Sequence, residues 1–237
     1  MTRNIIVRRI ATAAFLLVLF ACSSSDSLTG PEPRATALVA TPARNPVLFV
    51  HGWNSTGAAW FTMIDRFKAD GWDAQQELFN WTYNSGQSNA TTAQQLGAKV
   101  DEILAQTGAT KVDIVTHSMG ALSARYYIKN LGGGSRVDAF ISLGGPNHGT
   151  NTAVFCLQTS CVEMRPNSSF LNALNRKDET PGRIIRYATW WSGCDEVINP
   201  QSSTILKGAT NSQTACIRHS DLHEDAAVYA QVKTWVQ

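Results

Sequence analysis

KVDIVTHSMG, residues 111–120, is the stretch that decides how this chain folds. Its VDIV portion, residues 112–115, is rich in β-branched side chains and predicts a short buried strand. ALSARYYI, residues 121–128, follows after a turn and predicts a helix. Ser118 therefore stands on a strand-to-helix corner. Such a corner lifts a hydroxyl above the sheet and directs the next backbone N–H to the same place, so Ser118 is a candidate nucleophile.

The motif around Ser118 departs from its usual form. A complete nucleophile elbow reads G-x-S-x-G, and here Thr116 replaces the first glycine while Gly120 supplies the second. Because threonine is bulkier than glycine, the motif alone is moderately specific. Its position between a strand and a helix favours a nucleophile over the alternative, a serine in an ordinary strand-to-helix turn.

Further buried strands are predicted on both sides of this corner in the sequence. PVLFV, residues 46–50, and VDAFISL, residues 137–143, are the apolar runs expected of strands covered on both faces. A loop that opens with Gly52 follows the first run, and glycine lets the backbone approach a ligand closely. We therefore expect the backbone N–H groups of Trp53 and Met119 to form an oxyanion hole.

Helices and loops are predicted between these strands. Apolar residues recur at helical spacing within residues 60–67, 96–104 and 228–236, and a strand-like piece lies at 77–81. Residues 83–89 are polar and predict a surface loop that borders the site. Alternating strands and helices predict an α/β fold, with a mostly parallel central sheet and helices on both faces.

The acid of a catalytic triad is expected after the last convincing strand, GRIIRYATWW, residues 182–191. SGCDE follows it as a loop, and Asp195 is preferred to Glu196 because its shorter side chain starts one residue nearer the strand end. An Asp in a glycine-containing turn is usually a cap or a solvated side chain. Its place after this strand favours the catalytic interpretation.

Histidines on both sides of this acid are candidates for the base that takes the serine proton. His51 lies at a strand end before the nucleophile and is expected to shape its loop, and His148 precedes any plausible acid. His219 and His223 follow Asp195 and complete the order serine, acid, histidine. Chain order alone leaves both of them open.

Five stretches of this chain resemble a known family, the small secreted bacterial lipases and esterases of the α/β-hydrolase fold, of the Bacillus minimal-lipase type (lipase class 2). They are VLFVHGW, VDIVTHSMGALSARYYI, ISLGGPNHGT, the Cys194-Asp195 loop and HSDLHEDAAVYAQV, within residues 46–236. Thr116 falls where these minimal lipases carry alanine. The resemblance implies an α/β-hydrolase fold without a large lid, and a site that needs no metal.

The resemblance also separates the two histidines. In this family the catalytic histidine is followed by x-x-Leu and, six residues on, by Asp, and Leu222 and Asp225 give His219 that spacing. His223 lacks it. The implied triad is Ser118, Asp195 and His219.

These residues predict a carboxylic-ester hydrolase that acts on triacylglycerol or on short- to medium-chain esters through an acyl-enzyme. Alternatives are an acyltransferase or a lactone or polyester hydrolase on the same fold, and a non-catalytic binding lipoprotein. Trp53, Met119 and one of Trp190 or Trp191 are expected to line an acyl groove, since successive strand residues face opposite sides. We expect no cofactor.

The N-terminal segment has the features of an export signal. Three arginines precede an uncharged apolar run, residues 10–21, that is short for a membrane span. The run ends in LFAC, residues 19–22, which is similar to a bacterial lipobox, in which the cysteine is acylated and becomes the new N-terminus. We expect a lipoprotein signal peptide over residues 1–21 and lipidation of Cys22; ordinary cleavage after Ala21 is the alternative.

The rest of the chain fits one tethered domain. Residues 22–44 are polar, contain serines and prolines, and predict a flexible tether, followed by a catalytic domain over residues 45–237. Removal of residues 1–21 would leave 17 Lys and Arg against 18 Asp and Glu, so nucleic acid is not an expected partner. We expect an exported protein anchored in a membrane through its N-terminus, or a secreted one if the anchor is absent.

If Cys22 carries lipid, four cysteines remain: Cys156, Cys161, Cys194 and Cys216. Two disulfides are expected in an exported chain, with three possible connectivities, and the spacing lacks the paired C-x-x-C of a zinc site. We predict Cys156–Cys161, which closes a short loop, and Cys194–Cys216, which ties the acid loop to the segment that carries His219.

Lipidation of Cys22 can be tested on the exported protein. We expect mass spectrometry of the mature N-terminus to find a diacylated Cys22, because two acyl chains give the stable anchoring that one does not. The protein should then fractionate with membranes. A free, unmodified Cys22 in the soluble fraction would mean an unanchored exported protein.

Overall fold

The computed structural model describes residues 44–236. The expected signal peptide, the lipidation site at Cys22 and nearly all of the expected tether lie outside these residues. Within residues 44–236, no helix combines the length and apolar character needed to cross a bilayer.

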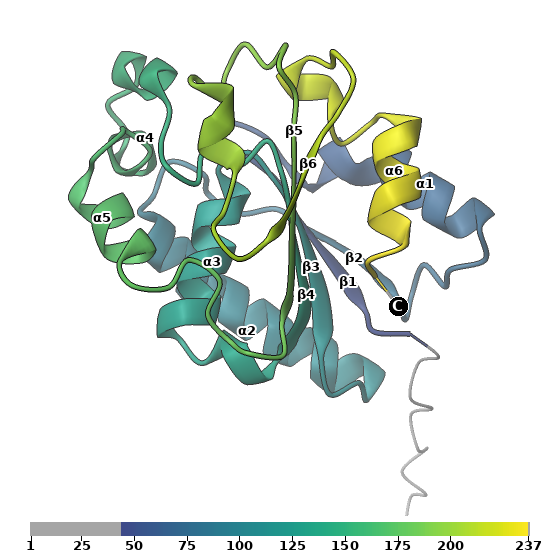
Figure 1. The fold of residues 1–237 in the computed structure, drawn as a ribbon. Helices are drawn as coiled ribbons and strands as arrows, with labels where there is room; N and C mark the ends of the chain where they lie inside the picture. Colours follow the sequence, from purple (N-terminus) through teal and green to yellow (C-terminus); the bar gives the residue numbers. More distant parts are fainter. Residues whose placement is uncertain (1–43, 237) are drawn as a thin grey trace, which may run out of the picture. The chain divides into compact units, whose positions relative to one another are not determined.

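A six-stranded sheet runs through the centre of the fold, and each neighbouring pair of strands is parallel (Figure 1). The strand order is β2-β1-β3-β4-β5-β6. The strands are β1 (Val47–Val50), β2 (Leu78–Trp81), β3 (Val112–His117), β4 (Val137–Leu143), β5 (Arg186–Trp191) and β6 (Thr210–Gln213). The α/β architecture predicted from the sequence is confirmed.

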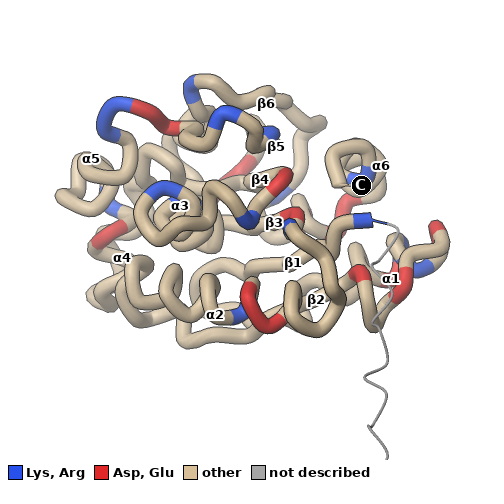
Figure 2. Tube along the Cα trace, turned by 90° about the horizontal axis from the view of Figure 1, so that it is seen from below, with Lys and Arg blue, Asp and Glu red and all other residues tan. Residues whose placement is uncertain are grey.

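Helices cover both faces of this sheet (Figure 1). On one face are α2 (Asn89–Thr107), α3 (Gly120–Asn130), α4 (Thr159–Glu163) and α5 (Ser169–Asn175), and on the other are α1 (Phe61–Ala69) and α6 (Ala226–Lys233). Short 3-10 helices are η1 (Gly57–Trp60), η2 (Gly133–Ser135), η3 (Asn151–Phe155), η4 (Gln201–Thr204) and η5 (His219–Asp221). Basic and acidic residues are interspersed around the periphery (Figure 2).

The side chains of β3 show why its apolar run is continuous. Ile114 belongs to the apolar cluster that contains Leu96 and Leu122, whereas its neighbour Val115 belongs to the cluster that contains Phe67. Successive strand residues face opposite sides of a sheet, and here each side is covered by helices. Both faces of β3 are therefore buried, and its carboxyl end is fixed in the middle of the sheet.

Two sequence-based expectations differ from the structure. The polar stretch 83–89 is not simply a surface loop: Tyr83 is buried, stacks on His51 with ring centroids 4.1 Å apart and donates from its hydroxyl to the His51 carbonyl oxygen (2.6 Å). Strand β6, with the sequence TNSQ, was not expected, because its polar residues lack a strand pattern. It forms at the sheet edge, where little of it is buried.

The longest connection in the described part of the chain, residues 144–185, joins β4 to β5 and carries η3, α4 and α5. Its α4 is joined to the start of α2 through Glu163, whose carboxylate accepts hydrogen bonds from the Ser88 hydroxyl (2.7 Å) and the Asn89 backbone N–H (2.7 Å). A carboxylate at a helix N-terminus is stabilised by the unpaired N–H groups and the helix dipole.

The contact between β1 and the start of α3 yields a stability test. A methyl group added at Gly120 would lie 2.6 Å from the His51 carbonyl oxygen and 2.7 Å from that of Val50, so the backbone would have to shift. We expect Gly120→Ala to lower the free energy of unfolding by about 1–3 kcal/mol in urea titrations. Gly134→Ala is the matched control, because its added methyl would have no neighbour nearer than 3.9 Å. Equal stability of the two variants would contradict the packing described.

Candidate active site

Ser118 occupies a strained corner between β3 and α3. Its φ of +53° lies in the left-handed region, which residues other than glycine adopt rarely and at a cost of about 1–3 kcal/mol. Its backbone N–H donates to the Leu143 carbonyl oxygen at the end of β4 (2.9 Å). This is the conformation expected of a nucleophile elbow, and it occurs at Ser118, where the sequence patterns predict the strand-to-helix corner.

The loop after β1 packs directly against this serine. A methyl group added at Gly52 would lie 2.8 Å from Cβ of Ser118, so no larger residue fits there without a shift. Trp53 follows Gly52, and Met119 follows Ser118, so the close contact brings the two backbone segments of the expected oxyanion hole to the candidate nucleophile.

Asp195 lies in the loop after β5 and is 2% exposed. Its Oδ1 accepts hydrogen bonds from the backbone N–H groups of Val197 (2.9 Å) and Ile198 (2.8 Å), and its Oδ2 accepts one from Nδ1–H of His219 (2.8 Å). Three donors thus fix both oxygens of the carboxylate. Because Nδ1 carries the proton in this bond, the other ring nitrogen of a neutral His219 is an acceptor.

The backbone of His219 is held on both sides. Its N–H donates to the carboxylate of Glu196 (3.1 Å), which also accepts a hydrogen bond from Arg218 (3.3 Å). Its carbonyl oxygen accepts from Nε2–H of His117 (2.9 Å), the residue before Ser118. Sequence reasoning missed the role of His117, and considered Glu196 only as an alternative acid; the signal was the position of His117 at the strand end beside the serine.

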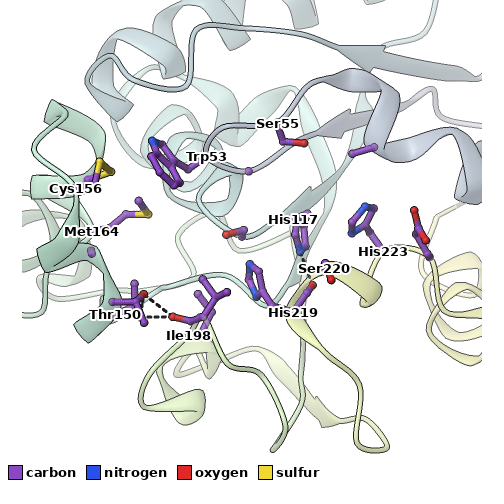
Figure 3. A pocket seen from close by; sticks show the side chains of 18 residues that line it. Trp53, Ser55, His117, Thr150, Cys156, Met164, Ile198, His219, Ser220 and His223 are labelled. Atoms are coloured by element: carbon purple, nitrogen blue, oxygen red, sulfur yellow. Dashed lines mark hydrogen bonds between the residues drawn. A yellow bond between two sulfur atoms is a disulfide. The ribbon is translucent and has the colours of Figure 1, made fainter.

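Three imidazole rings lie together at the pocket (Figure 3). The His117 ring is 4.6 Å from that of His219 and 4.4 Å from that of His223, between ring centroids. Burial first, and then the nearby His219 and His223, hold the pKa of His117 well below its ordinary value. Burial also lowers the pKa of His223. Both residues are therefore neutral near pH 7 and bring no positive charge to His219.

His51 and His148, which are not expected to act as the base, have partners elsewhere. His51 interacts through Nδ1 with the Gly52 carbonyl oxygen (2.7 Å) and accepts at Nε2 from the Tyr83 N–H (3.2 Å), and burial lowers its pKa. His148 contacts the Glu179 carboxylate (3.1 Å). Neither residue lines the pocket at Ser118.

A cavity of about 590 Å³ opens at this site. Ser118 lines it together with His117, His219 and His223, and Trp53, Cys156 and Met164 form the opposite wall (Figure 3). The expected acyl groove was wrong in part. Of the residues expected there, only Trp53 lines the cavity: Met119 and Trp190 are buried in the core, and Trp191 is not among the lining residues.

Both disulfides are present in the expected pairs. Cys194–Cys216 joins residues 22 positions apart and links the Asp195 loop to the segment before His219. Cys156–Cys161 spans five positions and lies in the wall of the cavity.

Comparison with known proteins shows to which family this chain belongs. The sequence profile described as Lipase (class 2) matches residues 44–235. The chain belongs to the class 2 lipase family. A triacylglycerol lipase of Burkholderia plantarii is 27% identical to this chain over 162 residues, which are 65% of this chain and 44% of the relative. The chain thus spans less than half the length of this relative.

Solved structures share the fold of this chain. The mature form of Bacillus licheniformis lipase BlEst2 superposes with a TM-score of 0.71 at 19% identity, covering 83% of this chain and 94% of the other. Aspergillus fumigatus lipase B superposes with a TM-score of 0.65 at 15% identity, covering 81% and 54%. The family resemblance and the α/β-hydrolase fold expected from the sequence are confirmed.

The two disulfides should contribute unequally to stability. In the chain-entropy model a crosslink stabilises more when it closes a longer loop, so loss of Cys194–Cys216 should cost about 3 kcal/mol and loss of Cys156–Cys161 about 2 kcal/mol. Denaturant unfolding of the Cys194→Ser/Cys216→Ser and Cys156→Ser/Cys161→Ser double variants measures both. The reverse order would show that loop length does not govern their contributions.

Proposed function

We propose that this class 2 lipase is a carboxylic-ester hydrolase with Ser118 as nucleophile, His219 as general base and Asp195 as the acid that orients it. The observation that carries the proposal is the 2.8 Å hydrogen bond from His219 to Asp195, made beside a pocket that Ser118 and His219 both line. The strained backbone of Ser118 supports its role, because strain of this kind is concentrated at functional sites.

The first half of the reaction forms an acyl-enzyme. His219 accepts the Ser118 proton at Nε2 while Oγ attacks the ester carbonyl carbon, and Asp195 stabilises the resulting imidazolium. The backbone N–H groups of Trp53 and Met119 receive the oxyanion, and one such donor contributes roughly a hundred-fold or more in rate. The tetrahedral intermediate then collapses: the carbon–oxygen bond to the alcohol breaks, and His219 returns the proton to the leaving oxygen.

The second half repeats the proton transfers with water. His219 takes a proton from a water molecule, whose oxygen attacks the acyl carbon, and the bond to Oγ of Ser118 breaks as His219 reprotonates that oxygen. A carboxylic acid leaves. Because His219 must move protons in both halves, the two backbone hydrogen bonds that hold it support both steps.

The substrate class follows from the cavity and from the family. Apolar side chains of Ala153, Met164, Val197 and Ile198 line part of the cavity, which suits the acyl chain of an ester. Each methylene buried there contributes about 0.8 kcal/mol until the cavity is filled. We propose short- to medium-chain esters, including those of glycerol, as substrates; the name of the Burkholderia relative agrees with this class.

Export is proposed on independent grounds. Two disulfides are typical of proteins that fold in an oxidising compartment, which supports an exported protein. The anchor at Cys22 remains a proposal that rests on the sequence.

Hydrolysis of p-nitrophenyl butyrate tests the triad. We expect Ser118→Ala to fold normally, to lose hydrolysis by at least about a thousand-fold and to resist labelling by an organophosphonate that the parent protein binds covalently. His219→Ala should lose comparable activity, whereas His223→Ala, the matched control from the same pocket, should retain most of it. Full activity in His219→Ala would reverse the assignment of the base, and an inactive, unlabelled parent protein would favour a non-catalytic binding domain.

A further inference from the structure

An apolar tip projects from the connection between β4 and β5. Phe155 is 90% exposed and Leu157 is 86% exposed, although fully exposed large apolar side chains are unfavourable in water. Three further residues of this surface are 41–53% exposed: Val154, Val162 and Trp53. Together the five residues are called the apolar tip. An exposed cluster of this kind is typical of an interaction surface.

The apolar tip is held in place by its own segment. The Cys156–Cys161 disulfide closes the loop that carries Leu157, and Arg165 donates a hydrogen bond to the Cys156 carbonyl oxygen (2.9 Å). At its base, Glu163 is bonded to the N-terminus of α2. Leu157 is thus exposed on a crosslinked loop, and Phe155 is exposed directly before that loop.

The apolar tip and the cavity share a wall. Ala153, Cys156 and Cys161 line the cavity, while Phe155 and Leu157, their neighbours in sequence, point away from it into solvent. Trp53, a member of the apolar tip, also lines the cavity (Figure 3). Its Nε1–H donates to the side chain of Gln158 (2.5 Å), which follows Leu157. Whatever contacts the apolar tip therefore lies next to residues that line the cavity.

Charge is absent from this segment. Residues 151–162 contain no Asp, Glu, Lys or Arg, and the first charged residue after them, Glu163, is directed to Ser88 and Asn89. The following cation, Arg165, is half-buried and donates to the carbonyl oxygens of Ala153 (3.5 Å) and Cys156 (2.9 Å). Residues 151–162 therefore offer no charged side chain of their own to a polyanion or an acidic peptide.

We propose that the apolar tip inserts into the acyl layer of a lipid surface and sets the opening of the cavity against it. This deepens the proposed function, because the esters would then be taken from a lipid layer as well as from solution. A second copy of the chain fits less well. The apolar tip consists of five residues, of which only Phe155 and Leu157 are almost fully exposed. A stable protein interface buries about 800 Å² and about 20 to 30 residues on each partner, and it needs a complementary shape. A fluid acyl layer needs no such shape.

Vesicle binding tests this proposal. The parent protein for this test is residues 22–237, which contain the whole described fold. It carries Cys22→Ser to prevent acylation and Ser118→Ala to prevent hydrolysis. Cosedimentation with phosphatidylcholine vesicles gives its partition coefficient, which we expect to fall roughly ten-fold or more in Phe155→Ser and in Leu157→Ser, as burial of one such side chain contributes that much. Ile184→Ser is the matched control, because Ile184 is 65% exposed but precedes β5 at the opposite end of the strands.

The outcomes separate the alternatives. Insertion predicts binding that is unchanged by about 0.5 M salt and by added phosphatidylglycerol. The proposal is overturned if Phe155→Ser binds as the parent does, if Ile184→Ser loses as much, if salt releases the protein, or if analytical ultracentrifugation finds a dimer that Phe155→Ser abolishes. With Ser118 restored, all three variants should hydrolyse dissolved p-nitrophenyl butyrate at the parent rate. If none of these proteins has activity, the proposed function fails, while the vesicle result still decides the role of the apolar tip.

Discussion

The close approach of two backbone segments, the loop after β1 and the corner that carries Ser118, is the constraint on which the site depends. Gly52 and Gly120 lack the side-chain atom that would separate the β1 loop from the corner between β3 and α3, and Ser118 adopts a left-handed conformation between them. Such a corner persists only when its surroundings determine it fully. Both faces of β3 are buried, and this burial holds the corner that follows the strand in place. The conformation of Ser118 therefore depends on the packing of the core.

Asp195 and His219 are not positioned by the buried sheet, as Ser118 is, because they lie in loops. Backbone N–H groups of Val197 and Ile198 hold the carboxylate, and a disulfide links its loop to the segment before the histidine. His117 then joins that histidine to the strand that carries the serine. The loops are therefore crosslinked to each other and to β3, which keeps three residues from distant parts of the chain in one arrangement.

Sequence patterns predicted the elements whose burial is encoded locally. The apolar runs of β1 and β4, and the helix after Ser118, were found because continuous or periodic apolar residues report burial directly. Patterns do not say which side chains meet. Met119 and one of Trp190 or Trp191 were expected in the groove because they lie near the site in sequence. Met119 and Trp190 pack into the core, and Trp191 does not line the cavity. The support of His219 by His117 likewise depends on a contact across 102 positions, which no local pattern contains.

Strand β6 has a consequence for the behaviour of the protein in concentrated solution. It forms one edge of the sheet, is four residues long and carries only polar side chains, of which Asn211 is bonded to the backbone of Leu206 and Ala209. Edge strands expose unpaired backbone groups that can template strand addition by another chain. A short, polar and internally bonded edge is a poor template, so the residues that defeated strand prediction are the ones that protect this side of the sheet against aggregation.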